Sequence, residues 1–207
     1  MRILFQGDSI TDVGRSRENE AEIGMGYPLL VKAELGHESP LAYEFFNRGT
    51  SGFRIVDIYA RIKADIIDLA PDVMSILVGV NDVWHEKRPF PNGIDADKYY
   101  RLYAMLIEEL REALPDLKII IMEPFVVHGT ATDEDWDYFS EEVPKRAAMA
   151  KRIADTYNLP FLPLQKGFDA LTELAPANYW VRDGIHPTSM GHDFIKQEWI
   201  RLFKSIV

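Results

Sequence analysis

Residues 73–80 read Val-Met-Ser-Ile-Leu-Val-Gly-Val, an apolar run that only Ser75 and Gly79 interrupt. A strand with one face in water alternates apolar and polar side chains, whereas a strand covered on both faces is apolar nearly throughout. The polar pair Asn81 and Asp82 follows the run at once. This stretch therefore predicts a strand inside a parallel sheet, with a polar turn at its carboxyl end.

Four shorter apolar runs are expected to be the other strands of the same sheet, at residues 3–5, 43–47, 119–122 and 161–162. Apolar residues recur at helical spacing between the runs, which predicts helices at residues 27–35, 55–69, 97–114, 142–157 and 189–206. The first helix is expected to stop at Gly36, because glycine is common just after a helix. Strands that alternate with helices predict a three-layer α/β/α sandwich around a five-stranded parallel sheet. No linker or repeat divides the chain, so residues 1–207 are expected to form a single domain.

The composition narrows the classes of function. The chain has 33 acidic and 23 basic residues, which give a net charge of −10. A nucleic acid or an anionic membrane surface would require a basic patch, so neither is an expected partner. The lack of cysteine excludes thiol catalysis, disulfides and cysteine-bound metals. No apolar run approaches the ~20 residues of a membrane helix, and the first residues do not resemble a secretion signal, so a cytoplasmic protein is expected.

Four polar turns that contain glycine carry the residues that could take part in catalysis. Three follow predicted strands, and the fourth lies near the end of the chain; they are residues 7–11 (Gly-Asp-Ser-Ile-Thr), 47–52 (Asn-Arg-Gly-Thr-Ser-Gly), 79–82 (Gly-Val-Asn-Asp) and 183–187 (Asp-Gly-Ile-His-Pro). In open parallel sheets, ligands bind beyond the carboxyl ends of the strands. We therefore expect these four turns to meet at one edge of the sheet.

Together the four turns supply the groups of a serine hydrolase. A serine hydroxyl becomes a nucleophile only when a base takes its proton, and the base needs a third group to hold its tautomer. Asp183 and His186 lie three residues apart, so one tight loop can direct the carboxylate at the imidazole, and Ser9 is the candidate nucleophile. Candidate donors for an oxyanion hole are the backbone N–H groups of Ser9 and Gly52 and the side-chain amide of Asn81.

The four turns resemble, in order, blocks of the SGNH (GDSL-type) serine hydrolases, although Ile10 stands where the name-giving motif has leucine. The resemblance spans residues 7–187 and implies a flavodoxin-like SGNH hydrolase fold. It implies Ser9 as the nucleophile, His186 as general base and acid, and Asp183 as the partner that orients the histidine. It also implies that Gly52 and Asn81 join Ser9 in the oxyanion hole.

Two further stretches, residues 79–85 and 123–125 (Glu-Pro-Phe), resemble the branch of this family that contains acetylxylan esterases and carbohydrate deacetylases. This resemblance implies an esterase that hydrolyses short acyl esters, preferably acetyl on a sugar, through an acyl-enzyme. A small-molecule or oligosaccharide ester is then the expected partner. Candidate substrate contacts are Asp8, Trp84, His85, Phe125 and Trp180. Assembly into a homo-oligomer is compatible with the aromatic loop around Trp136.

The residues leave other functions open. A lipase or thioesterase of the same family would act on longer acyl chains, and a catalytically silent relative would only bind carbohydrate. Phosphoryl transfer through Asp8 would require a second aspartate at the position of Ile10. The nucleophile elbow of the α/β-hydrolases would require glycine at the position of Thr11. The acidic run 133–137 lacks the glycine and the terminal glutamate of an EF-hand, so a solvated loop is expected there. No metal or other cofactor is expected.

Overall fold

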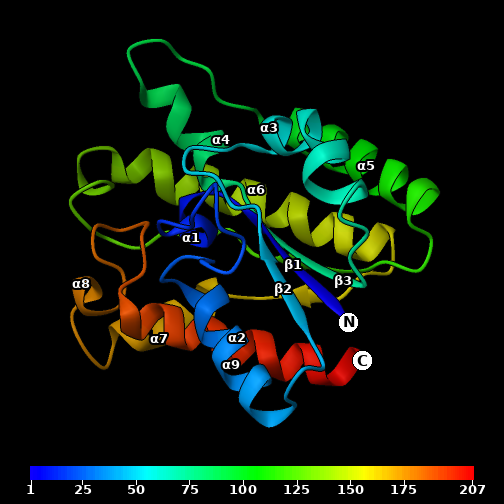
Figure 1. The fold of residues 1–207 in the computed structure, drawn as a ribbon. Helices are drawn as coiled ribbons and strands as arrows, with labels where there is room; N and C mark the ends of the chain where they lie inside the picture. The colour runs from blue at the N-terminus through cyan, green and yellow to red at the C-terminus, as the bar shows by residue number, and fades with distance from the viewer.

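The computed structural model describes all 207 residues, and its sheet has five strands. The sheet lies at the centre of the molecule (Figure 1). The strands are β1 (Arg2–Gly7), β2 (Glu44–Asn47), β3 (Val73–Leu77), β4 (Lys118–Met122) and β5 (Phe161–Leu162). They pair in the order β2-β1-β3-β4-β5, and every pairing is parallel. The predicted fold class and the five predicted strands are confirmed.

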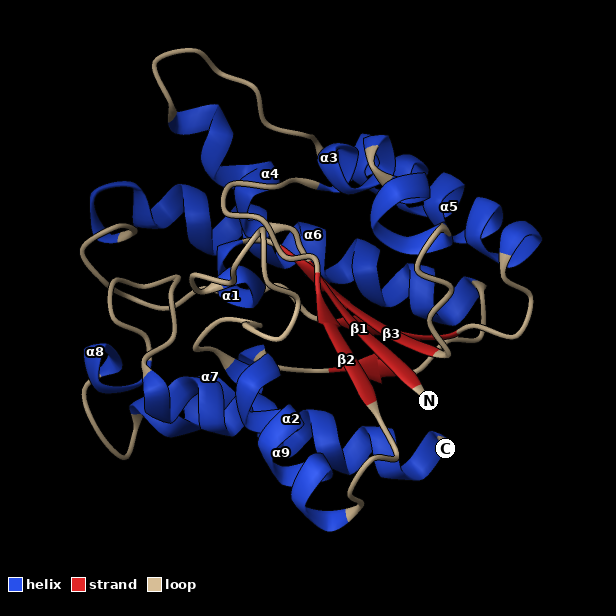
Figure 2. Ribbon diagram, viewed as in Figure 1, coloured by secondary structure: helices blue, strands red, loops and turns tan.

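Helices cover both faces of the sheet (Figure 2). One layer contains α3 (Ile55–Ala60), α5 (Ala96–Ala113) and α6 (Trp136–Thr156), and the other contains α2 (Tyr27–Glu38), α7 (Gln165–Thr172) and α9 (Ser189–Ile206). Successive side chains of a strand point to opposite faces, so Leu4 and Met74 join the core under the first layer while Phe5 and Leu77 join the core under the second. This two-sided burial is the reason that β3 is apolar throughout.

Aromatic packing under the second layer holds the strand that leads to Ser9. The Phe5 ring lies 5.7 Å from Tyr27 of α2 and 5.3 Å from Trp199 of α9, centroid to centroid. All three side chains are fully buried. Full burial of such a side chain contributes about 1.5–3 kcal/mol. Strand β1 is thereby packed against both helices.

The third strand ends three residues before its predicted limit at Val80. Val78 and Gly79 connect the strand to the short helix α4 (Val80–Trp84). Gly79 has φ +142°, and a Cβ there would lie 2.8 Å from the Pro124 ring, so a larger residue would be strained and crowded. The glycine permits the sharp turn that brings Asn81 to the edge of the sheet.

Two predicted helix limits near glycine and acidic residues are wrong. Helix α2 continues through Gly36 to Glu38, because Gly36 does not adopt the positive φ of a helix stop. Helix α6 begins at Trp136, directly after a 3-10 turn formed by Asp133–Asp135. The acidic run is therefore the start of a helix and not a loop, consistent with the favourable interaction of carboxylates with helix N-termini.

Other helices also differ from the expected pattern. The segment predicted as one helix over residues 55–69 is divided into α3 and a π-helix, Lys63–Ile67. Three short helices have no counterpart among the predictions, namely α1 (Ser9–Asp12), α4 and α8 (Ala177–Trp180); helix α7 was not predicted either. None of the helices has both the length and the apolar character needed to cross a bilayer.

Candidate active site

Three side chains from opposite ends of the chain form a hydrogen-bonded series. Ser9 is the first residue of α1, directly beyond β1, and its Oγ lies 2.9 Å from Nε2 of His186, 177 residues later in the sequence. His186 Nδ1 lies 2.8 Å from Oδ2 of Asp183. With a proton on Nδ1, the ring donates to the carboxylate and Nε2 is free to accept the proton of the serine hydroxyl. The geometry suits the activation of a serine nucleophile.

A tight turn aims the aspartate at the histidine. Oδ1 of Asp183 accepts the backbone N–H groups of Ile185 at 3.1 Å and His186 at 2.8 Å. Gly184 has φ +102°, and a Cβ there would lie 2.4 Å from Thr132 Oγ1, so the turn needs glycine. Partial burial acts to raise the pKa of Asp183, but the hydrogen bonds from His186 and Ile185 outweigh it and lower that pKa below its usual value. The carboxylate is therefore ionised and able to stabilise an imidazolium.

Hydrogen bonds connect the turns that carry the predicted oxyanion donors. The Gly52 backbone N–H has no acceptor within the protein, and Ser9 is the first residue of α1, where a helix N–H has no partner inside the helix. Asn81 donates one Nδ2 hydrogen to the carbonyl oxygen of Phe53, the residue after Gly52, at 3.2 Å, which leaves the other hydrogen free. The turns after β1, β2 and β3 thus supply N–H groups that can bind a developing oxyanion.

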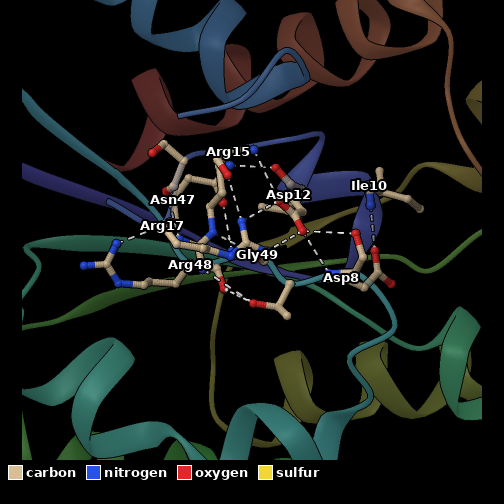
Figure 3. Close-up of polar contacts among 12 residues, drawn as sticks. Asp8, Ile10, Asp12, Arg15, Arg17, Asn47, Arg48 and Gly49 are labelled. Atoms are coloured by element: carbon tan, nitrogen blue, oxygen red, sulfur yellow. Dashed lines mark hydrogen bonds and ion pairs between the residues drawn. The ribbon is translucent and has the colours of Figure 1, made fainter. Parts of the chain in front are cut away.

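Polar contacts dock the turn after β2 onto α1 (Figure 3). Asn47 Nδ2 donates to the carbonyl oxygen of Thr11 at 2.7 Å, and Asn47 Oδ1 accepts the Gly49 N–H at 2.8 Å. A Cβ on Gly49 would lie 2.6 Å from the Asp12 nitrogen, so this close approach requires glycine. Asn47 and Asp12 were not among the predicted site residues. The available signal for Asp12 was its position, one helical turn after Ser9.

The candidate substrate contacts separate into two groups. The Trp84 ring lies 6.1 Å from the His186 ring, centroid to centroid, and Trp84, His85 and Trp180 are all half-buried. Phe125 is fully buried and stacks on Phe168 at 4.2 Å, and Asp8 is 1% exposed. The expectation that Phe125 and Asp8 offer a surface to substrate is corrected, because both side chains belong to the protein interior.

Asp8 has a structural role at the start of α1. Its Oδ1 accepts the Ile10 N–H at 2.9 Å, while its Oδ2 is buried without a hydrogen-bond partner. Burial raises the pKa of Asp8 from 3.8 to about 7, against a smaller lowering by the Ile10 hydrogen bond. An isolated carboxylate is costly to bury in the charged form, so the neutral form is favoured below that pH.

The Asp8→Asn variant should remove a pH dependence of stability. Between about pH 4 and 7 the folded protein keeps a proton on Asp8 that the unfolded chain releases, so the free energy of unfolding should fall as pH rises through this window. The rise in the pKa of Asp8 from 3.8 to about 7 corresponds to a loss of at most about 4 kcal/mol in the free energy of unfolding across this window. Asparagine keeps the acceptor for the Ile10 N–H but does not titrate. Urea unfolding from pH 4 to 8 should show wild type losing stability relative to Asp8→Asn; a constant difference would contradict the assignment.

Two other features lie apart from Ser9, His186 and Asp183. A cavity of about 500 Å³ is lined by Trp136 and His128 but by none of these three residues. The rings of Trp136 and His128 stack with their centroids 3.7 Å apart. Trp136 is therefore half-buried, with one face covered by the His128 ring. No three His, Asp or Glu side chains gather in an arrangement that would hold a metal ion.

Comparisons with known proteins agree with this geometry. The model of the GDSL-like Lipase/Acylhydrolase family matches residues 5–194. An acetylxylan esterase of Geobacillus stearothermophilus is 33% identical over 210 residues, which cover 97% of this chain and 92% of the relative.

Solved structures are similar over nearly the whole chain. A candidate GDSL-like lipase from Parabacteroides merdae ATCC 43184 has a TM-score of 0.92 at 35% identity, with 98% of this chain and 95% of that chain covered. The acetylxylan esterase Axe2 from Geobacillus stearothermophilus has a TM-score of 0.85 at 29% identity, with 97% and 93% covered. Structures of Axe2 include catalytic mutants in which a serine, an aspartate or a histidine is replaced by alanine. The resemblance that the four turns carry is thus confirmed, and the chain belongs to the GDSL-like lipase/acylhydrolase family of carboxylic ester hydrolases.

Proposed function

We propose that this protein is a serine esterase that removes acetyl groups from carbohydrate esters through an acyl-enzyme. The observation that carries the reaction type is the series Ser9 Oγ, His186 Nε2, His186 Nδ1 and Asp183 Oδ2, with separations of 2.9 and 2.8 Å. The substrate class is supported by the 33% identity to an acetylxylan esterase over 97% of the chain.

The first half of the proposed reaction forms the acyl-enzyme. His186 Nε2 takes the hydroxyl proton as Ser9 Oγ bonds to the acyl carbon, and the carbonyl electron pair moves onto oxygen. The tetrahedral intermediate collapses, the bond to the sugar oxygen breaks, and His186 returns the proton to that oxygen. In the second half, water repeats these steps against the Ser9 ester and releases acetate. Asp183 remains ionised and holds the imidazole in one tautomer throughout.

The oxyanion in each half-reaction is bound, in this proposal, by the free N–H groups of Ser9, Gly52 and Asn81. Each such donor is worth about 10²- to 10³-fold in rate, because it is already oriented before charge develops. Trp84 borders His186 and is proposed to contact the sugar as it departs. His85 and Trp180 remain proposed contacts of more distant parts of the substrate.

A substrate panel tests the acyl and sugar preference. We expect kcat/KM to be highest for acetylated xylose and xylo-oligosaccharides and to fall along p-nitrophenyl esters from acetyl to octanoyl. One methylene in a pocket changes the preference by about 10- to 200-fold, so the trend should be steep. A preference for octanoyl would favour the lipase or thioesterase alternative. A lack of hydrolysis of every ester would favour the catalytically silent alternative.

A further inference from the structure

The carboxylate of Asp12 joins the segment of the proposed nucleophile to the segment of the proposed oxyanion glycine. Asp12 is the last residue of α1, which begins with Ser9, and is only 4% exposed. Its Oδ2 accepts hydrogen bonds from the backbone N–H and the hydroxyl of Ser51, each at 3.0 Å. Ser51 immediately precedes Gly52. One carboxylate oxygen therefore connects the helix of the nucleophile with the turn that carries the Gly52 N–H.

Arg17 keeps this carboxylate charged. Its Nη1 donates to Oδ1 at 2.9 Å and its Nη2 donates to Oδ2 at 2.8 Å. Burial acts to raise the pKa of Asp12, but the hydrogen bonds from Arg17 and Ser51 outweigh it and lower that pKa below its usual value. Hydrogen bonds to an ionised acceptor are about twice as strong as those between neutral groups. The contact with Ser51 is thus a strong one for an exposed turn.

The Asp12 contact holds the short stretch of Ser51 and Gly52 between two other anchors. Thr50 before it donates its N–H to the Gly7 carbonyl oxygen at 3.0 Å, and the Phe53 carbonyl oxygen after it accepts Asn81 Nδ2 at 3.2 Å. The earlier part of the turn is fixed to α1 by Asn47 and by the close approach of Gly49. Gly52 itself has φ +85°, and nothing lies within 4 Å of the position that a Cβ would occupy. The connection from the Gly52 end of the turn to α1 runs through Ser51 and Asp12. Loss of the carboxylate would let the Gly52 N–H move relative to Ser9.

We propose that Asp12 is a positioning residue, which fixes Ser51 against α1 and thereby holds the Gly52 N–H at the oxygen of the tetrahedral intermediate. This inference rests on the function proposed above, because it needs Gly52 to be an oxyanion donor. Misplacement of a catalytic group by 1 Å can cost about 10²-fold. The donor acts on charge that develops only in the transition state, so the effect falls on kcat and not on KM.

Alanine and asparagine at position 12 test the proposal. Asp12→Ala should lower kcat for p-nitrophenyl acetate by about 10- to 10²-fold and leave KM within about threefold. The inhibition constant of a simple alkyl boronic acid, which forms a tetrahedral adduct with serine, should rise by the same factor. Asp12→Asn keeps an oxygen that can accept the Ser51 N–H, so it should recover part of kcat. Active sites are counted from the initial burst of p-nitrophenol, so that a smaller folded fraction does not imitate the effect.

Glu123→Gln is the matched control. Oε2 of Glu123 also accepts two backbone N–H groups of another segment, those of Leu164 at 2.6 Å and Gln165 at 2.9 Å, but neither of these residues belongs to one of the four turns. The kcat of the Glu123→Gln variant per active site should equal that of wild type. If Asp12→Ala does not fold, Asp12→Asn and Ser51→Ala provide the test, and both should lower kcat and weaken boronate binding in parallel.

The outcomes separate this inference from the proposed function. Wild-type kcat in the Asp12 variants, or a fall in kcat without weaker boronate binding, would overturn the role of Asp12. If Ser9→Ala retained the esterase activity, the proposed function itself would fail. Activity that depends on Ser9 but not on Asp12 would leave the proposed function standing and remove this inference alone.

Discussion

Replacing Ser9 with alanine is expected to lower kcat/KM for p-nitrophenyl acetate by about 10⁵-fold or more. The substitution removes the Oγ that lies 2.9 Å from His186 Nε2 and that attacks the acyl carbon in the proposed reaction. The remaining N–H donors would still polarise the ester, so a residual rate on the order of 10³-fold above that in water is expected. Initial rates of p-nitrophenol release by wild type and variant measure the loss.

The Ser9→Ala variant should fold as wild type does, because Ser9 Oγ has no hydrogen-bond partner other than His186. Loss of one hydrogen bond costs about 1 kcal/mol, which lowers Tm by about 2–4 °C in a domain of this size. Ser140→Ala is a suitable control, since Ser140 is exposed on α6 and bonds only the Asp137 carbonyl oxygen. Activity of Ser9→Ala within tenfold of wild type would exclude Ser9 as the nucleophile.

The sheet was predictable because burial on both faces leaves a strong pattern in the sequence. The end of β3 was not, since Val78 and Val80 stay buried in the turn and in α4 and hydropathy does not change where the strand stops. The local signal was Gly79, whose φ of +142° ends the strand.

The limits of α2 and α6 were difficult to predict because glycine and proline are found both inside helices and at their ends. Glycine costs a helix about 1 kcal/mol relative to alanine, which packing can offset, and α2 continues through Gly36. Helix α6 likewise continues through Pro144, although proline removes a backbone donor. The acidic residues 133–137 carried the true signal for the start of α6, because carboxylates favour a helix N-terminus.

At the site, the short spacing of Asp183 and His186 predicted that these two residues pair. The position of Ser9 in a polar turn after a strand made it the candidate nucleophile. The sequence predicted neither Asp12 nor Asn47 as supports, because their partners are backbone groups of turns distant in sequence. It also assigned Phe125 to the substrate, whereas the chain buries that ring beside Phe168. The sequence shows the type of residue at position 125 and its neighbours along the chain. Whether the Phe125 ring is exposed depends instead on how α7 packs against the segment after β4.

Asp183→Asn is expected to lower kcat by about 10⁴-fold while the turn keeps its shape. The side-chain oxygen of the introduced asparagine can still accept the N–H groups of Ile185 and His186, which fix the turn in wild type. Its NH₂ group, however, would face His186 Nδ1 and favour the tautomer with the proton on Nε2. That nitrogen would then be a donor toward Ser9 and unable to accept the hydroxyl proton. Rates of p-nitrophenyl acetate hydrolysis over pH 6–9 measure the loss.

A double variant distinguishes this tautomer effect from general damage. If Asp183 acts only through His186 and Ser9, adding Asp183→Asn to Ser9→Ala should cause little further loss, because residues that act as one unit are strongly non-additive. A further loss as large as that of the single variant would mean that Asp183 supports binding or folding independently. A single-variant loss below tenfold would contradict the role of Asp183 in orienting His186, because at 2.8 Å the carboxylate is the hydrogen-bond partner of Nδ1.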